Sequence, residues 1–281
     1  SSAASDVYKR QCEYWSLEQA KLGKGAPPKF QGKIVMITGG SGTIGFAIAE
    51  AFSKLGAQTV LVDKDETTLK KAITKLGHGH GYFPIDVTEA DAANQAMLAA
   101  IQNFGGLDIL VSNAGAAHAG PMLSISNDEL RSAFELNFFS HYSFSTAAAK
   151  ILKNQNRGGQ ILFNISKQAV NPGRNFGAYG LPKATTFFLM RQLALELGSD
   201  GIRVNGVNAD RIRSGLLTDD FISSRAKSRG VSESEYMAGN LLGKEVTAEH
   251  VADAFTSLAC AESTTGHVMT VDGGNVEASL R

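Results

Sequence analysis

Seven short apolar runs, rich in β-branched residues, alternate along this chain with longer segments of helical periodicity. The runs lie near residues 33–38, 58–63, 81–85, 107–112, 160–165, 202–207 and 267–271. Because parallel strands need a crossover between them, usually a helix, this alternation predicts an α/β fold. We expect a doubly wound parallel sheet with helices on both faces and ligands at the carboxyl ends of its strands.

The 281 residues are long for one domain, but an α/β fold with a single large sheet reaches this size. Residues 1–29 are predicted to be an N-terminal extension or linker, because they are largely polar and end with Pro27-Pro28 just before the first strand. Residues 30–281 then form one dinucleotide-binding domain. Within it, the segment 215–243 is rich in serine, glycine and charge, and we expect it to be a lid over the substrate.

A glycine-rich turn links the first strand to a helical pattern. Strand, glycine-rich turn and helix form the context that a dinucleotide-binding fingerprint requires. The glycines let the backbone approach a pyrophosphate, which the N-terminus of the helix then stabilises. We expect Gly42 to supply the positive φ angle of the turn. The predicted cofactor-binding residues of this turn are Gly39, Ser41, Gly42, Thr43, Ile44 and Gly45.

The second strand ends at Asp63, eighteen residues past Gly45. A carboxylate in this place accepts hydrogen bonds from the adenosine ribose hydroxyls and repels a 2′-phosphate. The sequence therefore predicts NAD as the cofactor in preference to NADP. The adjacent Lys64 would soften that preference.

Tyr179 and Lys183 lie four residues apart and share one face of the helix predicted at 178–197. An ammonium group within ~4–6 Å of a phenol stabilises the phenolate and lowers the tyrosine pKa from its usual ~10. Ser166 precedes the tyrosine by thirteen residues and can hold a substrate oxygen beside the phenol. This set predicts Tyr179 as a general acid/base, although the Tyr-x-x-x-Lys spacing alone is a weak signal.

These motifs together resemble the short-chain dehydrogenase/reductase family over residues 30–275. The resemblance extends to Asp86-Val87-Thr88, Ser112-Asn113-Ala114-Gly115, Asn137, Arg203-Val204-Asn205 and Val271-Asp272-Gly273-Gly274. It implies a Rossmann-type fold and hydride transfer between a nicotinamide cofactor and an alcohol or carbonyl carbon. It also implies a catalytic set of Asn137, Ser166, Tyr179 and Lys183, in which Asn137 holds a water for proton relay.

The resemblance implies further cofactor contacts. These are Asp86 and Val87 near the adenine, Asn113, Ala114 and Gly115 after the fourth strand, Tyr179 and Lys183 near the nicotinamide ribose, and Ser214 near the carboxamide. The chain departs from the family pattern in two places. Thr43 stands where short-chain members usually have a glycine, and Ala209-Asp210 replaces the usual Pro-Gly. The role of Asp210 is left open.

Two segments, 164–173 and 208–217, resemble more narrowly the dehydrogenase half of bifunctional aldolase/short-chain dehydrogenases. This resemblance implies either an upstream aldolase domain in the full-length protein or a stand-alone relative. No aldolase-type metal cluster precedes the dinucleotide-binding motif in the sequence, and we expect no metal site. The local His78-Gly79-His80 is interpreted as a solvated turn.

Composition excludes several classes of partner. The formal net charge is +0, so no electrostatic argument favours nucleic acid or an anionic membrane. The sequence contains no run of ~18 apolar residues that would cross a membrane. Cys12 and Cys260 are far apart and imply no disulfide framework, which favours a cytoplasmic location. Cys260 is predicted to be a buried apolar residue.

Polar side chains gather in the loops expected around the active end of the sheet. They are Lys167, Gln168, Asn171, Arg174, Arg211 and Arg213. They favour a small polar substrate, such as a polyol, a sugar-derived alcohol, a hydroxyaldehyde, a sugar acid or a phosphorylated molecule. His118, His141 and His267 are expected to be structural.

Two other functions stay open at this point. The Gly39, Gly42, Gly45 spacing is also that of nucleotide-sugar epimerases and dehydratases, although the chain after the sixth strand is short for their substrate domain. The chain could instead be a non-catalytic NAD-binding scaffold or an oligomerisation module of a fused aldolase. The helices predicted at 127–152 and 178–197 have small apolar faces that resemble the family's dimer contact. We therefore expect a homodimer or homotetramer.

Overall fold

The computed structural model describes residues 27–275 apart from 118 and 216. The predicted N-terminal linker, 1–29, lies outside the described residues except for its last three. Cys12 lies outside them as well.

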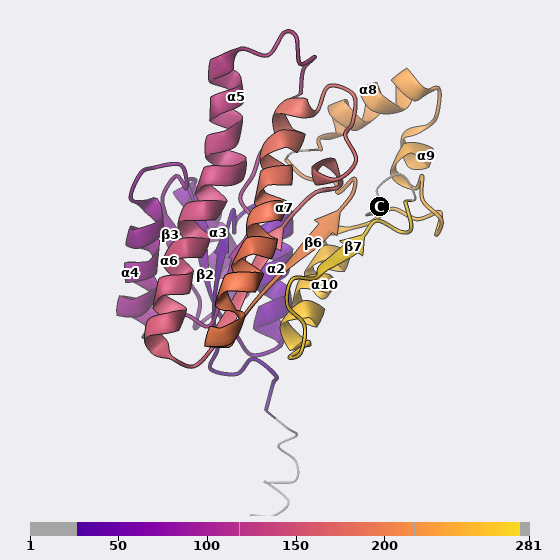
Figure 1. The fold of residues 1–281 in the computed structure, drawn as a ribbon. Helices are drawn as coiled ribbons and strands as arrows, with labels where there is room; N and C mark the ends of the chain where they lie inside the picture. The colour runs from indigo at the N-terminus through magenta and orange to yellow at the C-terminus, as the bar shows by residue number, and fades with distance from the viewer. Residues whose placement is uncertain (1–26, 118, 216, 276–281) are drawn as a thin grey trace, which may run out of the picture.

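Seven parallel strands form a single sheet in the order β3-β2-β1-β4-β5-β6-β7, which confirms the predicted doubly wound fold (Figure 1). The strands are β1 Ile34–Thr38, β2 Gln58–Asp63, β3 Gly81–Pro84, β4 Ile109–Ser112, β5 Gly159–Asn164, β6 Ile202–Ala209 and β7 Val268–Val271. Met36 of β1 is paired with Val60 on one side and Leu110 on the other. The strand order reverses between β1 and β4, and a doubly wound sheet opens a ligand crevice at such a point.

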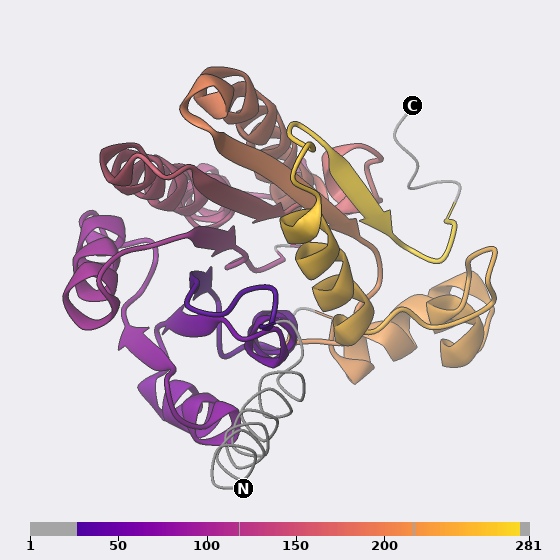
Figure 2. The same ribbon diagram turned by 90° about the horizontal axis from the view of Figure 1, so that it is seen from below.

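Helices cover both faces of the sheet (Figure 2). One face carries α2 Thr43–Lys54, α3 Glu66–Leu76 and α10 Ala248–Cys260, and the other carries α4 Ala92–Phe104, α6 Ser140–Gln155 and α7 Gly177–Leu197. Each face has its own apolar core, the first around Phe52 and Phe255 and the second around Phe144 and Met190. The five inner strands are largely buried on both faces, which explains why they appear in the sequence as continuous apolar runs, whereas the edge strands β3 and β7 are only partly buried.

The helix predicted over 127–152 is interrupted. It consists of α5 Asn127–Phe134, a π-helical turn η1 Glu135–Phe139, and α6. A π turn inserts one extra residue into the helix, and such turns often occur at functional sites. Periodicity did not predict it, because its side chains follow an ordinary helical pattern.

The glycine turn differs from its prediction. The positive φ angle lies at Gly39, where φ is 62°. Gly42 has φ −74° and ψ 167°, the extended backbone usual at a helix N-cap, so the prediction that it supplies the positive φ was wrong. The chain bends directly after β1, and the Gly42 N–H then donates to the Gly39 carbonyl at 3.2 Å.

The predicted lid region contains two helices, α8 Asp219–Arg229 and α9 Glu233–Met237. Its apolar side chains form a third cluster, separate from the two cores on the sheet faces. The cluster consists of Leu217, Ile222, Ala226, Tyr236 and Met237. The remaining short helices are η2 Lys167–Ala169 and η3 Gly198–Asp200.

Cys260, predicted to be buried, is exposed, because it ends α10 on the solvent side. His80 of the predicted solvated turn is half-buried and hydrogen-bonds with Ser53 and Thr59. No helix within the described residues is both long and apolar enough to cross a membrane.

Candidate active site

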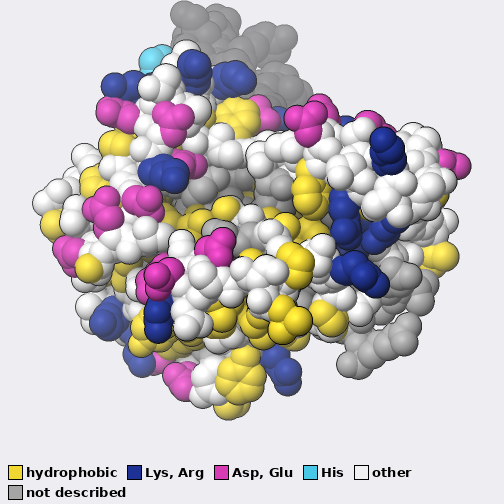
Figure 3. Space-filling view, turned by 90° about the horizontal axis from the view of Figure 1, so that it is seen from above, with side chains coloured by type: hydrophobic (Ala, Val, Ile, Leu, Met, Phe, Trp, Pro, Cys, Tyr) yellow, Lys and Arg dark blue, Asp and Glu magenta, His cyan; other side chains and the backbone are white. Residues whose placement is uncertain are grey.

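A cavity of about 1090 Å³ opens at the carboxyl ends of the strands. Figure 3 shows the hollow on this face of the molecule. Most of the predicted site residues line it: Gly39, Gly42, Thr43, Ile44, Gly45, Asp63, Asp86, Val87, Asn113, Ala114, Gly115, Ser166, Tyr179, Lys183 and Ser214. Ser41 and Asn137 do not line the cavity and instead hold residues that do.

One end of the cavity is formed by the glycine-rich turn and the start of α2. The N-terminus of α2 faces it at Thr43 and Ile44, and within the described chain no side chain caps this terminus and no acidic residue lies in its first turn. Its N–H groups are therefore available to a pyrophosphate. Gly45 packs so closely on the turn that a Cβ there would lie 2.1 Å from the Gly39 oxygen.

The Asn113 side chain supports this end of the site. Its Nδ2 donates to the Thr38 carbonyl at 3.0 Å, and its Oδ1 accepts from Asn164 Nδ2 at 2.8 Å. These bonds tie together the ends of β1, β4 and β5. The strand ends that surround the cavity are thereby fixed relative to one another.

Asp63 presents a carboxylate at the end of β2. Its Oδ2 accepts from the Ser41 hydroxyl at 2.7 Å, and its Oδ1 accepts from the Lys64 N–H at 2.8 Å. Ser41 thus orients the carboxylate that lines the cavity. At the end of β3, Asp86 accepts from Thr88 N–H at 3.0 Å, a bond that lowers the pKa of Asp86.

Ser166, Tyr179 and Lys183 meet at the other side of the cavity. The Ser166 side chain acts on the Tyr179 phenol to lower its pKa, and the Lys183 Nζ lies 5.9 Å from the centre of the tyrosine ring. All three side chains are buried. The loop holds Ser166 in place, because the Gln168 N–H donates to its Oγ at 3.2 Å.

Burial shifts the proton affinities of this pair in opposite directions. It raises the pKa of Tyr179 to about 12, against the effect of the Ser166 hydrogen bond, and lowers the pKa of Lys183 to about 7. The predicted lowering of the Tyr179 pKa by Lys183 is therefore not seen, because loss of solvation dominates at a site this deeply buried. In this state Tyr179 is a protonated acid at neutral pH.

The lysine has a second neighbour that the sequence did not assign to the site. Lys183 Nζ donates to the Asn164 carbonyl at 3.0 Å and lies 3.4 Å from His141 Nε2, while His141 Nδ1 lies 2.6 Å from Ser112 Oγ. Burial lowers the pKa of His141 well below its usual value, so the ring is neutral and can accept from the ammonium. His141 lies one helical turn after Asn137, and this spacing could have indicated that it belongs to the site.

Asn137 sits in the π turn, fully buried. Its Nδ2 donates to the Ala116 carbonyl at 2.9 Å, and its own carbonyl accepts from the Thr186 hydroxyl at 2.7 Å. The residue therefore joins α7, which carries Tyr179 and Lys183, to the loop after β4.

The depressed pKa of Lys183 predicts a pH dependence of stability. Between pH ~7 and ~10 the unfolded chain binds a proton that the folded chain does not, so stability rises with pH in this window. We expect the free energy of unfolding of the wild type, relative to Lys183→Met, to increase from pH 7 to pH 9 by up to ~1.4 kcal/mol per pH unit. Urea denaturation at both pH values measures it. Lys150→Met, at an exposed position, is the control, because this variant keeps Lys183. If the difference in unfolding free energy between the wild type and Lys183→Met were the same at both pH values, the lowered pKa of Lys183 would be contradicted.

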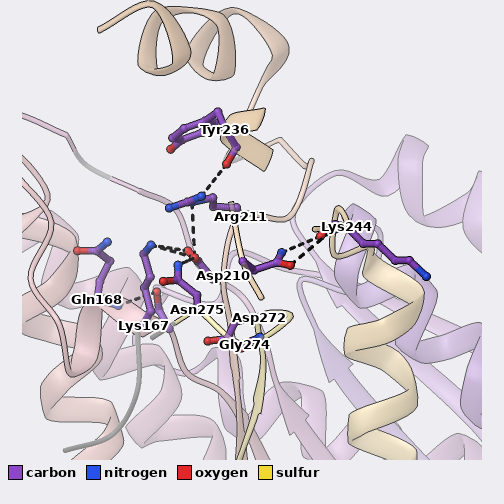
Figure 4. Close-up of polar contacts among 11 residues, drawn as sticks. Lys167, Gln168, Asp210, Arg211, Tyr236, Lys244, Asp272, Gly274 and Asn275 are labelled. Carbon is purple, nitrogen blue, oxygen red and sulfur yellow. Dashed lines mark hydrogen bonds and ion pairs between the residues drawn. The ribbon is translucent and has the colours of Figure 1, made fainter. Parts of the chain in front are cut away.

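Asp210, whose role the sequence left open, holds three chain segments together (Figure 4). Its buried carboxylate pairs with Lys167 Nζ at 2.8 Å and Arg211 Nε at 3.5 Å, and accepts from Asn275 Nδ2 at 2.6 Å. Lys167 directly follows Ser166. The carboxylate therefore joins the loop after β5 to the ends of β6 and β7.

No group of three or more histidine, cysteine, aspartate or glutamate side chains within the described part of the chain is arranged to hold a metal ion.

The chain is similar to known proteins in sequence and in fold. A family model described as enoyl-(acyl carrier protein) reductase matches residues 40–275. The chain is 34% identical to the uncharacterized oxidoreductase YuxG of Bacillus subtilis over 284 residues, which cover 96% of this chain and 41% of that protein. The chain thus spans less than half of the length of YuxG.

Two solved structures are similar throughout. The 3-ketoacyl-(acyl-carrier-protein) reductase from Brucella melitensis, complexed with NADH, has a TM-score of 0.79 at 26% identity, covering 87% of this chain and 98% of that one. L-Sorbose reductase from Gluconobacter frateurii, complexed with NADPH and L-sorbose, has a TM-score of 0.80 at 27% identity, covering 89% and 98%.

Proposed function

The chain belongs to the short-chain dehydrogenase/reductase family, and we propose that it is an NAD(H)-dependent oxidoreductase that interconverts a small polar alcohol and its carbonyl compound. The observation that carries this proposal is that Ser166, Tyr179 and the buried Lys183 line one cavity together with the glycine-rich turn and the N-terminus of α2. When bound, the nicotinamide cofactor supplies or accepts the hydride.

The protein's own residues handle the proton. In reduction, Tyr179 donates its phenolic proton to the substrate oxygen as that oxygen becomes an alcohol, and in oxidation the phenolate takes the proton back. Ser166 orients the substrate oxygen next to the phenol. Lys183 holds the cofactor ribose and exchanges protons with the tyrosine, and Asn137 fixes α7, which carries both residues, to the loop after β4.

The preference for NAD rests on Asp63. Its carboxylate lines the cavity after β2, where it would accept from ribose hydroxyls and repel a 2′-phosphate. Among the similar structures one holds NADH and another NADPH, so the residue itself has to be tested.

Replacing Asp63 with alanine is expected to lower the ratio of kcat/KM for NAD to that for NADP by about 100-fold. The variant loses charge-assisted hydrogen bonds to NAD and the repulsion of NADP together. Steady-state kinetics with both cofactors measures the ratio. Glu66→Gln removes a nearby exposed carboxylate that does not line the cavity and should leave the ratio unchanged. A wild type that prefers NADP would contradict the NAD assignment.

We also infer that the protein forms a homo-oligomer. Large apolar side chains are exposed on η1, α6 and α7, where the sequence predicted a dimer contact: Phe139, Tyr142, Leu181, Phe188 and Leu195. A monomer in multi-angle light scattering would contradict this inference. The lid at 215–243, the cytoplasmic location and the upstream aldolase domain stay predictions.

A further inference from the structure

We infer that the substrate carries an anionic group, a carboxylate or a phosphate, and that Arg225 and Arg229 of α8 bind it. This inference rests on the proposed function and narrows its substrate class. Both arginines line the cavity, on the part formed by the loop after β5 and by α8.

Several cations that the sequence placed near the substrate are already neutralised. Lys167 and Arg211 share the carboxylate of Asp210. Arg213 pairs with Asp219 and Glu245, both at 2.7 Å, and does not line the cavity. None of these three side chains is available to a ligand without breaking an existing ion pair.

Three other arginines line the same cavity: Arg174, Arg225 and Arg229. Between residues 27 and 275, leaving aside 118 and 216, none of them forms an ion pair. Figure 3 shows Lys and Arg side chains gathered on one side of the hollow. Of the carboxylates that line the cavity, Asp63 and Asp86 lie at the dinucleotide end, Asp210 is paired, and Glu135 is in η1. The substrate end therefore has an excess of positive charge.

Arg225 is held so that it can face a ligand. Its guanidinium carbon lies 5.5 Å from the centre of the Phe176 ring, and its Nε is buried without a hydrogen-bond partner. A buried N–H with no acceptor costs free energy that a bound anion would recover. The Phe176 carbonyl accepts from the Tyr179 N–H at 3.1 Å, so the ring under Arg225 belongs to a residue bonded to the backbone of the acid/base residue.

Arg229 is held in a similar way. It stacks on Tyr236 at 5.2 Å, and Arg211 lies 4.8 Å from the centre of the same ring. The Tyr236 carbonyl accepts from Arg211 Nη1 at 2.6 Å, which fixes α9 to the end of β6 (Figure 4). Stacked guanidinium groups keep their N–H edges free, and those edges match the geometry of a carboxylate or a phosphate.

The first test is binding in the presence of saturating NADH, so that the dinucleotide end of the cavity is filled. Glycerate, glycerol 3-phosphate and glycerol share a three-carbon skeleton and differ in charge, and each is titrated calorimetrically. We expect the two anions to bind more tightly than glycerol, and Arg225→Gln/Arg229→Gln to weaken their binding by about 10- to 100-fold. The stronger of the two anions distinguishes a carboxylate site from a phosphate site.

Arg191→Gln is the matched control. Arg191 is exposed on α7, stacks on Phe187 at 5.9 Å and does not line the cavity, so its loss should leave anion binding unchanged. If the double variant folds poorly, Arg225→Lys takes its place in the test. This variant keeps the positive charge without the planar guanidinium fork and should retain part of the affinity for the anions. Anions that bind no better than glycerol, or binding that survives in a folded double variant, would overturn the inference.

Turnover separates this inference from the function on which it rests. In an active wild type, the ratio of kcat/KM for an anionic alcohol to that for its uncharged analogue should fall by about 10- to 100-fold in the double variant. An equal fall for both substrates would refute the anion site and leave the oxidoreductase standing. If the wild type binds the anions through these arginines but oxidises no alcohol and reduces no carbonyl, the anion site is supported and the proposed oxidoreductase function is contradicted.

Discussion

Replacing Tyr179 with phenylalanine is expected to lower kcat by about 10²- to 10⁴-fold, the usual contribution of a positioned acid/base, while the fold is kept. The substitution removes one oxygen, and the ring keeps its buried place on α7. The lost group is the only proton donor that the proposed mechanism places at the substrate oxygen. Single-turnover kinetics with NADH measures the chemical step, and NADH fluorescence measures cofactor binding, which should change far less.

Tyr142→Phe is the control for this experiment. Tyr142 lies on the inferred oligomer face of α6 and does not line the cavity, and the substitution removes only its hydroxyl and keeps the ring, so turnover should not change. A Tyr179→Phe enzyme with wild-type kcat would refute the acid/base assignment. A wild type that binds NADH and turns over no alcohol or carbonyl would support the scaffold alternative instead.

Gly45→Ala is expected to destabilise the fold by about 3 kcal/mol, the upper end of the usual range for overpacking. A Cβ at this position would lie 2.1 Å from the Gly39 oxygen and 2.9 Å from Gly40 Cα, and both are backbone atoms that cannot rotate away. The turn that presents the N-terminus of α2 would have to open. We therefore expect NADH binding to be lost as well, measured by calorimetry beside urea denaturation.

Gly42→Ala provides the comparison. Its Cβ would lie 3.4 Å from the Gly39 oxygen, an ordinary contact, and its φ of −74° suits any residue. Its stability should change by less than about 1 kcal/mol. If the two variants were destabilised equally, the explanation that close backbone packing requires glycine at position 45 would be wrong.

The sheet could be predicted from sequence because its five inner strands, largely buried on both faces, form uninterrupted apolar runs. All seven strands were located within a few residues. The positions of Ser166, Tyr179 and Lys183 followed from spacing on strand and helix. The positive φ at Gly39 could not be predicted from the sequence, because Gly39, Gly40 and Gly42 can all adopt it.

Electrostatic features were the least predictable. The sequence suggested that Lys183 lowers the Tyr179 pKa, but it contains no measure of burial, and burial dominates both shifts. It also counted Lys167, Arg211 and Arg213 as available cations, because ion pairing depends on how the loops fold: Asp210 pairs with the first two, and Asp219 and Glu245 pair with the third. Arg225 and Arg229 were missed, since nothing in a helical pattern shows which face of α8 meets the cavity.

The small cluster of Leu217, Ile222, Ala226, Tyr236 and Met237 gives α8 and α9 an apolar core of their own. Parts of a protein with separate cores can be altered by evolution at different rates, because a substitution in one does not have to be compensated in the other. Within this family, one structural relative is named for an acyl-carrier substrate and another for L-sorbose. A recognition segment that carries its own core can be exchanged between such proteins while the sheet and its hydride chemistry stay constant.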